Sequence, residues 1–140
     1  MIQTLTGIDS TASALAAERL RMEVITQNIA NANTVRGIDG KPYQRQHVIF
    51  ENALSQAQAN GASAHSVGVA RIEQNHRPPR LIFNPGHPDA NAEGMVSVPN
   101  INIHEEMADL IVASRSFEAN LAVVKNARNM AMQTLSIGKR

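Results

Sequence analysis

The stretch HEEMADLIVASRSFEANLAVVKNARNMAMQTL, residues 104–135, contains neither proline nor glycine. Apolar side chains recur in it every three or four residues, and only Ser114 and Arg128 interrupt the repeat. The repeating residues are Met107, Leu110, Phe117, Leu121, Val124, Ala131 and Leu135. Because this spacing places them along one face of a helix, the pattern predicts a single helix of about 50 Å.

The residues that flank this stretch match the chemistry of helix ends. Asn102 followed by Glu105 resembles a capping box, in which side chains satisfy the free N–H groups of the first turn. Glu105, Glu106 and Asp109 place negative charge at the positive end of the helix dipole, so we interpret them as capping acids. Gly138 lies where the helix is expected to stop.

The other end of the chain repeats the pattern. Within residues 1–29, the apolar repeat consists of Leu5, Ile8, Ala12, Leu15, Met22 and Ile29. Arg19 and Thr26 interrupt it, as Ser114 and Arg128 interrupt the second repeat. The pattern predicts a first helix that begins near Thr6, Asp9 or Ser10 and runs to about Asn31. Two such stripes are typical of helices that wrap around each other or around neighbours, which favours assembly over catalysis.

The two arginines within the stripes have two interpretations. Arg19 and Arg128 can rotate to the helix surface and lay their stems over apolar neighbours. Alternatively, they pair with acids on an adjacent subunit and fix the register of the helices, as polar residues do in coiled coils. The residues alone leave both interpretations open.

The sequence QNIANANT, residues 27–34, ends the first helix and is rich in asparagine. The simpler interpretation is a frayed helix end, since asparagine tolerates the left-handed conformation that terminates helices. The alternative is a fixed turn in which side chains such as Asn28 and Asn31 bond to backbone groups or to a neighbouring subunit.

The segment between the helices differs from both, because it holds every proline and most turn signals. Short apolar runs bounded by turns predict strands near residues 47–50, 67–72, 81–83 and 96–98. Residues 53–66, rich in Ala, Gln, Asn, Gly and Ser, are expected to form a loop. We therefore predict an α+β fold with two units: a helical coiled-coil unit formed by residues 1–34 and 104–140, and a small β-rich insert formed by residues 35–103.

Composition narrows the function classes. The chain of 140 residues has a net charge of +1, no cysteine and only 3% aromatic residues. Basic residues are spread out, with Arg71, Arg77 and Arg80 as the densest patch, so we expect no nucleic-acid partner. No stretch approaches the ~20 apolar residues of a membrane span, and no cleavable signal peptide is visible. Because aromatic side chains supply much of an ordinary core, the missing buried surface is expected to come from other subunits.

No motif indicates catalysis, a cofactor or a metal. The stretch HEEMA at 104–108 begins like a zinc-protease helix but has alanine where the second histidine is required. Glycines 37 and 40 form no phosphate-binding loop, and no small-molecule substrate is indicated. We predict no catalytic, cofactor-binding or metal-binding residues. A hydrolase site built from His47, His65 or His76 is a distant alternative.

Three groups of segments together resemble a known family, the rod, hook and hook-associated proteins of the bacterial flagellum, and within it the small proximal rod subunits. The segments are ASAL at 12–15 with QNIANANT at 27–34, DGKPYQR at 39–45 with VIF at 48–50, and NPGHPDAN at 84–91 with ASRSFEAN at 113–120. The resemblance covers nearly the whole chain. One departure is Ala14, where many of these proteins have glycine.

The resemblance implies a structural subunit of the flagellar basal body. Such subunits are exported uncleaved through the flagellar type III apparatus and assemble in the periplasm into the hollow rod that transmits motor torque. Their partners are copies of themselves, other rod subunits and the export apparatus, and their terminal helices form the inner coiled-coil layer of the tube. The candidate assembly residues here are Leu15, Arg19, Met22, Asn28, Ile29, Asn31, Phe117, Leu121, Val124 and Arg128.

The main alternative is a soluble helical adaptor or regulator that dimerises through its terminal helices. Concentration-dependent sedimentation separates the two, because an adaptor stops at a small oligomer. If partner helices come mainly from neighbouring subunits, we expect the free monomer to have loose ends around a more protected middle. The opposite expectation is a stable hairpin formed by the two helices within one chain.

Overall fold

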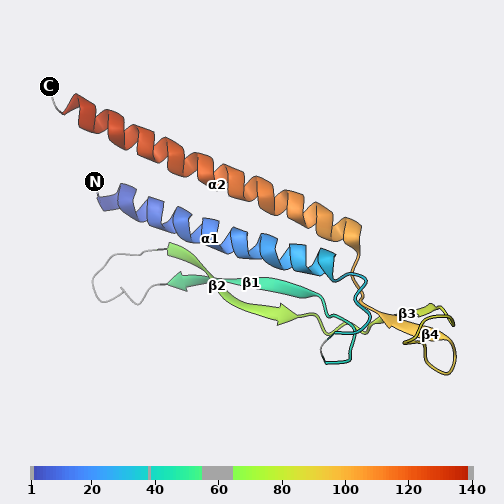
Figure 1. The fold of residues 1–140 in the computed structure, drawn as a ribbon. Coiled ribbons are helices and arrows are strands. Elements are labelled where there is room, and N and C mark those ends of the chain that lie inside the picture. The colour runs from blue at the N-terminus through green and yellow to red at the C-terminus, as the bar shows by residue number, and fades with distance from the viewer. Residues whose placement is uncertain (1, 38, 55–64, 139–140) are drawn as a thin grey trace.

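The computed structural model describes residues 2–37, 39–54 and 65–138, and two long helices dominate it (Figure 1). Helix α1 spans Ile2–Ala30 and helix α2 spans Ile103–Ile137. They pack against each other in opposite directions, so that both chain ends lie at the same end of the molecule (Figure 1). The predicted α+β fold with paired terminal helices is confirmed.

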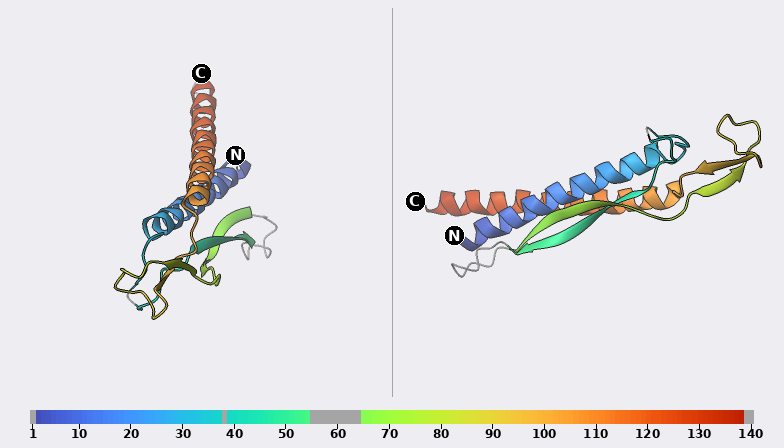
Figure 2. Two further views of the ribbon diagram at one scale, coloured as in Figure 1. Left: turned by 90° about the vertical axis from the view of Figure 1, so that its right-hand side faces the viewer. Right: turned by 90° about the horizontal axis from the view of Figure 1, so that it is seen from below.

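The strands form two antiparallel hairpins in the described part of the chain. Strands β1 (Gln46–Leu54) and β2 (His65–Gln74) form a long hairpin with a bulge between Ile49 and Phe50. Strands β3 (Arg80–Phe83) and β4 (Met95–Val98) form a short one. The long hairpin packs against α1, so α1 lies between α2 and the hairpin, and the short hairpin projects beyond the helices (Figure 2).

Several predicted boundaries are wrong. Helix α1 begins at Ile2, before the predicted capping residues Thr6, Asp9 and Ser10, whereas its end at Ala30 agrees with the predicted end near Asn31. Strands β1 and β2 extend into the predicted loop at residues 53–66, because pairing between strands outweighs the weak strand propensity of residues such as Ala53. Residues 55–64 of that loop lie outside the described part of the chain.

The start of α2 confirms the capping prediction. The Asn102 side chain accepts a hydrogen bond from the His104 N–H at 3.1 Å and donates one to the Glu105 carboxylate at 3.1 Å. At the other end, the Gly138 N–H donates to the Thr134 carbonyl at 3.2 Å. Gly138 has a φ of −73°, so the helix stops there without a left-handed glycine.

The apolar core is small and lies toward the end where the two helices join the strands. Among the described residues, the buried apolar side chains are Ala17, Val24, Ile25, Ala32, Val96, Ile101 and Ala113. Alanines contribute little buried area, and none of these residues is aromatic. The core of a single chain therefore leaves much of the apolar surface of α2 uncovered.

Candidate assembly interface

A buried cluster of polar side chains joins α1, β1 and α2. Asn28, near the end of α1, is only 1% exposed. Its Nδ2 donates to the Gln46 carbonyl at 2.8 Å and to Glu106 Oε2 at 3.0 Å. Its Oδ1 accepts from the Gln46 N–H at 2.9 Å and from the Tyr43 hydroxyl at 3.2 Å. We call this cluster, formed by Asn28, Tyr43, Arg45, Gln46 and Glu106, the polar junction.

Glu106 is the charged centre of the polar junction and is also only 1% exposed. Arg45 Nε donates to Glu106 Oε1 at 2.5 Å, and Arg45 Nη2 lies 3.5 Å from Asp109 Oδ2. Burying a carboxylate is costly unless it is paired and hydrogen-bonded, and here both of its oxygens have a partner. The interpretation of Glu106 as a capping acid is therefore incomplete, because its side chain links the two helices to the start of β1.

Tyr43 adds a titratable group to the polar junction. Burial raises the pKa of the Tyr43 phenol above 10.0, and the negative charge of Glu106 raises it further. The phenol therefore remains protonated at neutral pH, as it must to donate its hydrogen bond to Asn28.

The asparagine-rich end of α1 is a fixed turn within the chain. Asn31 Nδ2 donates to the Gln27 carbonyl at 2.9 Å, and its Oδ1 accepts from the Thr34 hydroxyl at 3.2 Å. Only glycines have a positive φ among the described residues, so the left-handed explanation for these asparagines is wrong. The simpler interpretation, a frayed end, missed Asn28 because the partner of its amide on α2 is 78 residues away in sequence.

The candidate assembly residues on α1 occupy two kinds of position. Leu15, Met22 and Ile29 are half-buried. Arg19 is exposed, and its Nε lies 3.2 Å from Glu23 Oε1 on the same helix.

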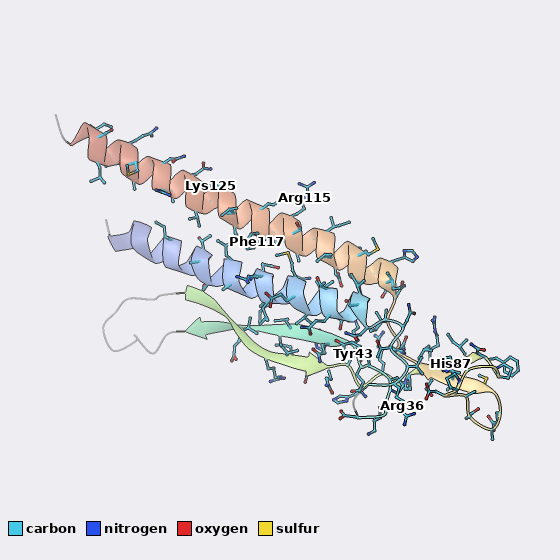
Figure 3. All side chains as sticks on the ribbon, in the orientation of Figure 1. Arg36, Tyr43, His87, Arg115, Phe117 and Lys125 are labelled. Atoms are coloured by element: carbon cyan, nitrogen blue, oxygen red, sulfur yellow. The ribbon has the colours of Figure 1, made fainter. Side chains whose placement is uncertain are left out.

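On α2, Phe117 and Val124 are half-buried, and Phe117 lies on the side that faces α1 (Figure 3). Leu121 is 37% exposed, and Arg128 is exposed. The structure brings part of the predicted set to the helix pair and leaves Leu121 at its edge. Whether these residues contact another subunit stays a prediction.

The least exposed positions of α2 are offset from the predicted stripe. They include Glu106, Leu110, Ala113, Phe117, Asn120, Val124 and Ala127, which also recur every three or four residues. The sequence pattern identified Leu110, Phe117 and Val124 but missed Glu106 and Asn120, because these two residues are polar. The sequence did contain a signal for their burial, because Glu106 and Asn120 lie at the same three-to-four spacing as the apolar residues of this face.

A second apolar stripe on α2 faces solvent. Its residues lie two or three helical turns apart and are 54–76% exposed. They are Val112, Val123, Met130 and Ile137, and we call them the outer stripe. The sequence reasoning missed this stripe, since small or polar residues occupy the positions between its members: Ser116, Ala119, Asn126 and Gln133. An apolar stripe of this length without a partner among the described residues is typical of an interaction surface.

Other kinds of site find no support in the described part of the chain. No group of three His, Asp or Glu side chains is placed there to hold a metal ion. No described helix is long and apolar enough to cross a membrane.

Comparison with known protein families shows to which class of protein the chain belongs. The family model described as "Flagella basal body rod protein" matches residues 8–36, and "Flagellar basal body rod FlgEFG protein C-terminal" matches residues 92–137. The two matches cover most of α1 and all of α2. The fold, with its paired terminal helices, is therefore that of a rod protein of the bacterial flagellar basal body.

Relatives narrow this class. The chain is 38% identical to the flagellar basal-body rod protein FlgC of Salmonella typhimurium, over 94% of this chain and 95% of the relative. It is 40% identical to FlgC of Yersinia enterocolitica over the same shares of both chains, and 38% identical to FlgC of Bacillus subtilis, over 95% of this chain and 97% of the relative. The chain belongs to the FlgC family of flagellar basal-body rod proteins.

Family membership settles the choice between function classes. The chain is a structural, non-enzymatic subunit of the flagellar rod and a motility protein. It assembles with other rod subunits. The helical adaptor and the histidine hydrolase are set aside.

Proposed function

We propose that this chain polymerises through its terminal helices into the proximal part of a hollow rod that transmits motor torque. The observation that carries the proposal is the outer stripe, whose apolar side chains are 54–76% exposed in the single chain. Burying each of them against a neighbouring helix contributes about 1.5–3 kcal/mol at most, which is enough in sum to drive association.

The polar junction supports a mechanical role. A tube requires each subunit to make the same head-to-tail contact with the next one, so that the assembly does not stop at a closed dimer. The repeat is accurate only if α1 and α2 keep a fixed orientation. Asn28 and Glu106 join the helices to each other and to β1 through hydrogen bonds with defined geometry, whereas a purely apolar contact permits sliding.

The packing of the two long helices against each other, with the short hairpin beyond them, supports a layered tube. In this proposal residues 1–34 and 104–140 form the inner helical layer, and residues 35–103 form the outer insert. Leu15, Met22, Ile29, Phe117, Leu121 and Val124, with Arg19 and Arg128 beside them, contact neighbouring subunits where they are not covered by their own chain. Asn28 and Asn31 contribute by fixing the end of α1.

The family resemblance extends the proposal to how the protein is exported and where it assembles. We infer export through the flagellar type III apparatus without cleavage and assembly in the periplasm. The partners are further copies of this chain, other rod subunits and components of the export apparatus.

One substitution on the outer stripe tests the proposal. Val123→Asp places a carboxylate where a neighbouring helix is expected, and it should abolish rod formation and swimming while leaving the monomer folded. Asn129→Asp is the matched control, because it adds the same charge at an exposed position on another side of α2. Intact rods carrying Val123→Asp, counted by electron microscopy of isolated basal bodies, would contradict the proposal.

A further inference from the structure

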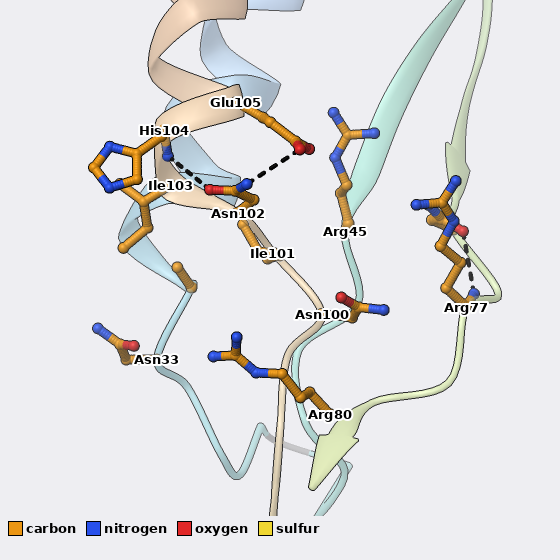
Figure 4. Close-up of a pocket in the computed structure, with 12 residues that line it drawn as sticks. Asn33, Arg45, Arg77, Arg80, Asn100, Ile101, Asn102, Ile103, His104 and Glu105 are labelled. Carbon is orange, nitrogen blue, oxygen red and sulfur yellow. Dashed lines mark hydrogen bonds between the residues drawn. The ribbon is translucent and has the colours of Figure 1, made fainter. Parts of the chain in front are cut away.

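A polar pocket of about 530 Å³ opens at the base of the β3–β4 hairpin, between the end of α1 and the start of α2 (Figure 4). Arg45, Arg77 and Arg80 line it, together with amide side chains such as Asn100. A smaller hollow of about 260 Å³ adjoins it, shares Arg77 with it, and adds Lys41.

The positive charge of this pocket is only partly balanced. Arg45 is paired with Glu106 and Asp109 in the polar junction. Arg77, Arg80 and Lys41 have no acidic partner among the residues that the structure describes. The one acid that lines the pocket, Glu105, accepts a hydrogen bond from Asn102. We call Lys41, Arg77 and Arg80 the basic pocket.

The opposite end of the same hairpin carries an unbalanced negative charge. The tip, residues 84–94, holds Glu93, whose side chain is exposed and has no basic partner among the described residues. Asp89 on the same tip differs, because Arg36 Nη1 lies 3.3 Å from its Oδ1.

Hydrogen bonds and a tight glycine contact hold the tip that presents Glu93 in one conformation. Asn91 Oδ1 accepts hydrogen bonds from the backbone N–H groups of Glu93 at 3.0 Å and Met95 at 2.8 Å. Gly94 has a φ of +74°, and a Cβ at this position would lie 3.1 Å from the Phe83 ring. A preorganised group loses less conformational entropy on binding, so the tip is suited to insert into a preformed pocket.

The strand register places these two charged surfaces at opposite ends of the β3–β4 hairpin. Arg80 pairs with Val98 at its base, and Phe83 pairs with Met95 next to the tip. Two different complementary surfaces on one chain generate a head-to-tail contact, which continues from copy to copy. We propose that Glu93 of one subunit binds in the basic pocket of the next copy of this chain. This contact rests on the proposed function, because the helices must first align the subunits.

Contacts between exposed charges are individually weak and are screened by salt. The contact therefore sets the register between subunits more than it drives their association. Reversing the charge of one partner lowers the affinity of each contact by roughly fivefold.

Site-specific crosslinking tests the neighbourhood directly, since the chain has no cysteine of its own. The full chain carrying Arg80→Cys and Glu93→Cys is assembled in cells, and isolated basal bodies are treated with a short bis-maleimide. A ladder of linked multimers is expected. Arg80→Cys with Glu51→Cys is the matched control, because Glu51 is also exposed but lies on β1. Rods that form without a ladder above this control overturn the inference.

A charge swap tests the pairing itself. Glu93→Lys alone, and Arg77→Glu with Arg80→Glu, should each reduce swimming, and the three changes in one chain should restore it. If neither reversal alters swimming, the inference fails. If both reduce swimming and the combination does not restore it, the pocket binds a partner other than a second copy, and the inference also fails.

The swap separates this inference from the proposed function. If the reversals leave swimming unaltered while Val123→Asp abolishes rods, only the hairpin contact is wrong. If Val123→Asp also leaves rods intact, assembly through the helices is wrong as well.

Discussion

At the junction end of the molecule, α1 and α2 are joined by amide and charged side chains that are almost fully buried, whereas further along α2 apolar side chains face solvent. Asn28 and Glu106 are each 1% exposed, and the outer stripe is 54–76% exposed. Ordinary globular proteins have the reverse arrangement, with apolar groups inside and charged groups outside. The inversion separates two tasks: the buried polar contacts fix one geometry within the chain, and the exposed apolar surface awaits a partner.

The largest expected effect lies on the apolar side of this comparison. Leu121→Asp should block rod assembly while leaving the monomer soluble and folded. Leu121 is 37% exposed in the single chain, so aspartate keeps access to water there, but burial against a neighbour costs several kcal/mol. Swarming assays measure whether the rod assembles, and far-UV circular dichroism measures whether the monomer is folded. Normal swarming would show that no subunit packs against this edge of α2.

The second-largest expected effect concerns the polar junction. Glu106→Gln should lower the free energy of unfolding of the monomer by about 3 kcal/mol, because it removes the buried carboxylate that pairs with Arg45 and leaves the guanidinium only the more exposed Asp109. Urea denaturation measures the change. The control is Glu105→Gln, an exposed neighbour, which should cost less than about 0.5 kcal/mol. Equal effects of the two substitutions would show that the buried Glu106–Arg45 pair contributes no more to stability than an exposed glutamate.

A smaller effect follows from the pKa of Tyr43. The folded state raises this pKa above 10.0, so the associated stability is fully present below pH 10 and is lost as the pH rises through the folded-state pKa. Tyr43→Phe should remove this alkaline loss and cost about 1 kcal/mol at neutral pH through the hydrogen bond to Asn28. Urea denaturation at neutral and alkaline pH tests both. An unchanged alkaline slope in the variant would exclude Tyr43 as its source.

The smallest difference should appear in amide exchange along each helix of the dilute monomer. We expect slow exchange near Asn28 and Glu106 and faster exchange toward Ile2 and Ile137, where the described core residues are absent. Assembly into rods should then slow the exchange of the outer parts. Uniform protection along both helices in the monomer would show that the helix pair is stable without partners and would contradict the expected loose ends.

The sequence was sufficient for the features that depend on neighbours along the chain. The three-to-four spacing predicted both helices, and Asn102 with Glu105 predicted where α2 begins. Features that depend on distant residues were missed. Nothing near Glu106 in the sequence indicates that it contacts Asn28 and Arg45, so its acidic character favoured a capping role. The outer stripe was missed for another reason, since small and polar residues between its members, such as Ser116 and Asn126, weaken the repeat.

The distance along the chain between the partners in the polar junction also bears on the order of folding. Asn28 and Glu106 are 78 residues apart, and Arg45 and Glu106 are 61 apart. Closing such large loops is slower than forming a helix turn or a hairpin, because more chain entropy is lost before any contact compensates for it. We therefore expect the β1–β2 hairpin to form before the two helices meet, with the docking of α2 as the last step. A chain that ends before Glu106 lacks the carboxylate at the centre of the polar junction.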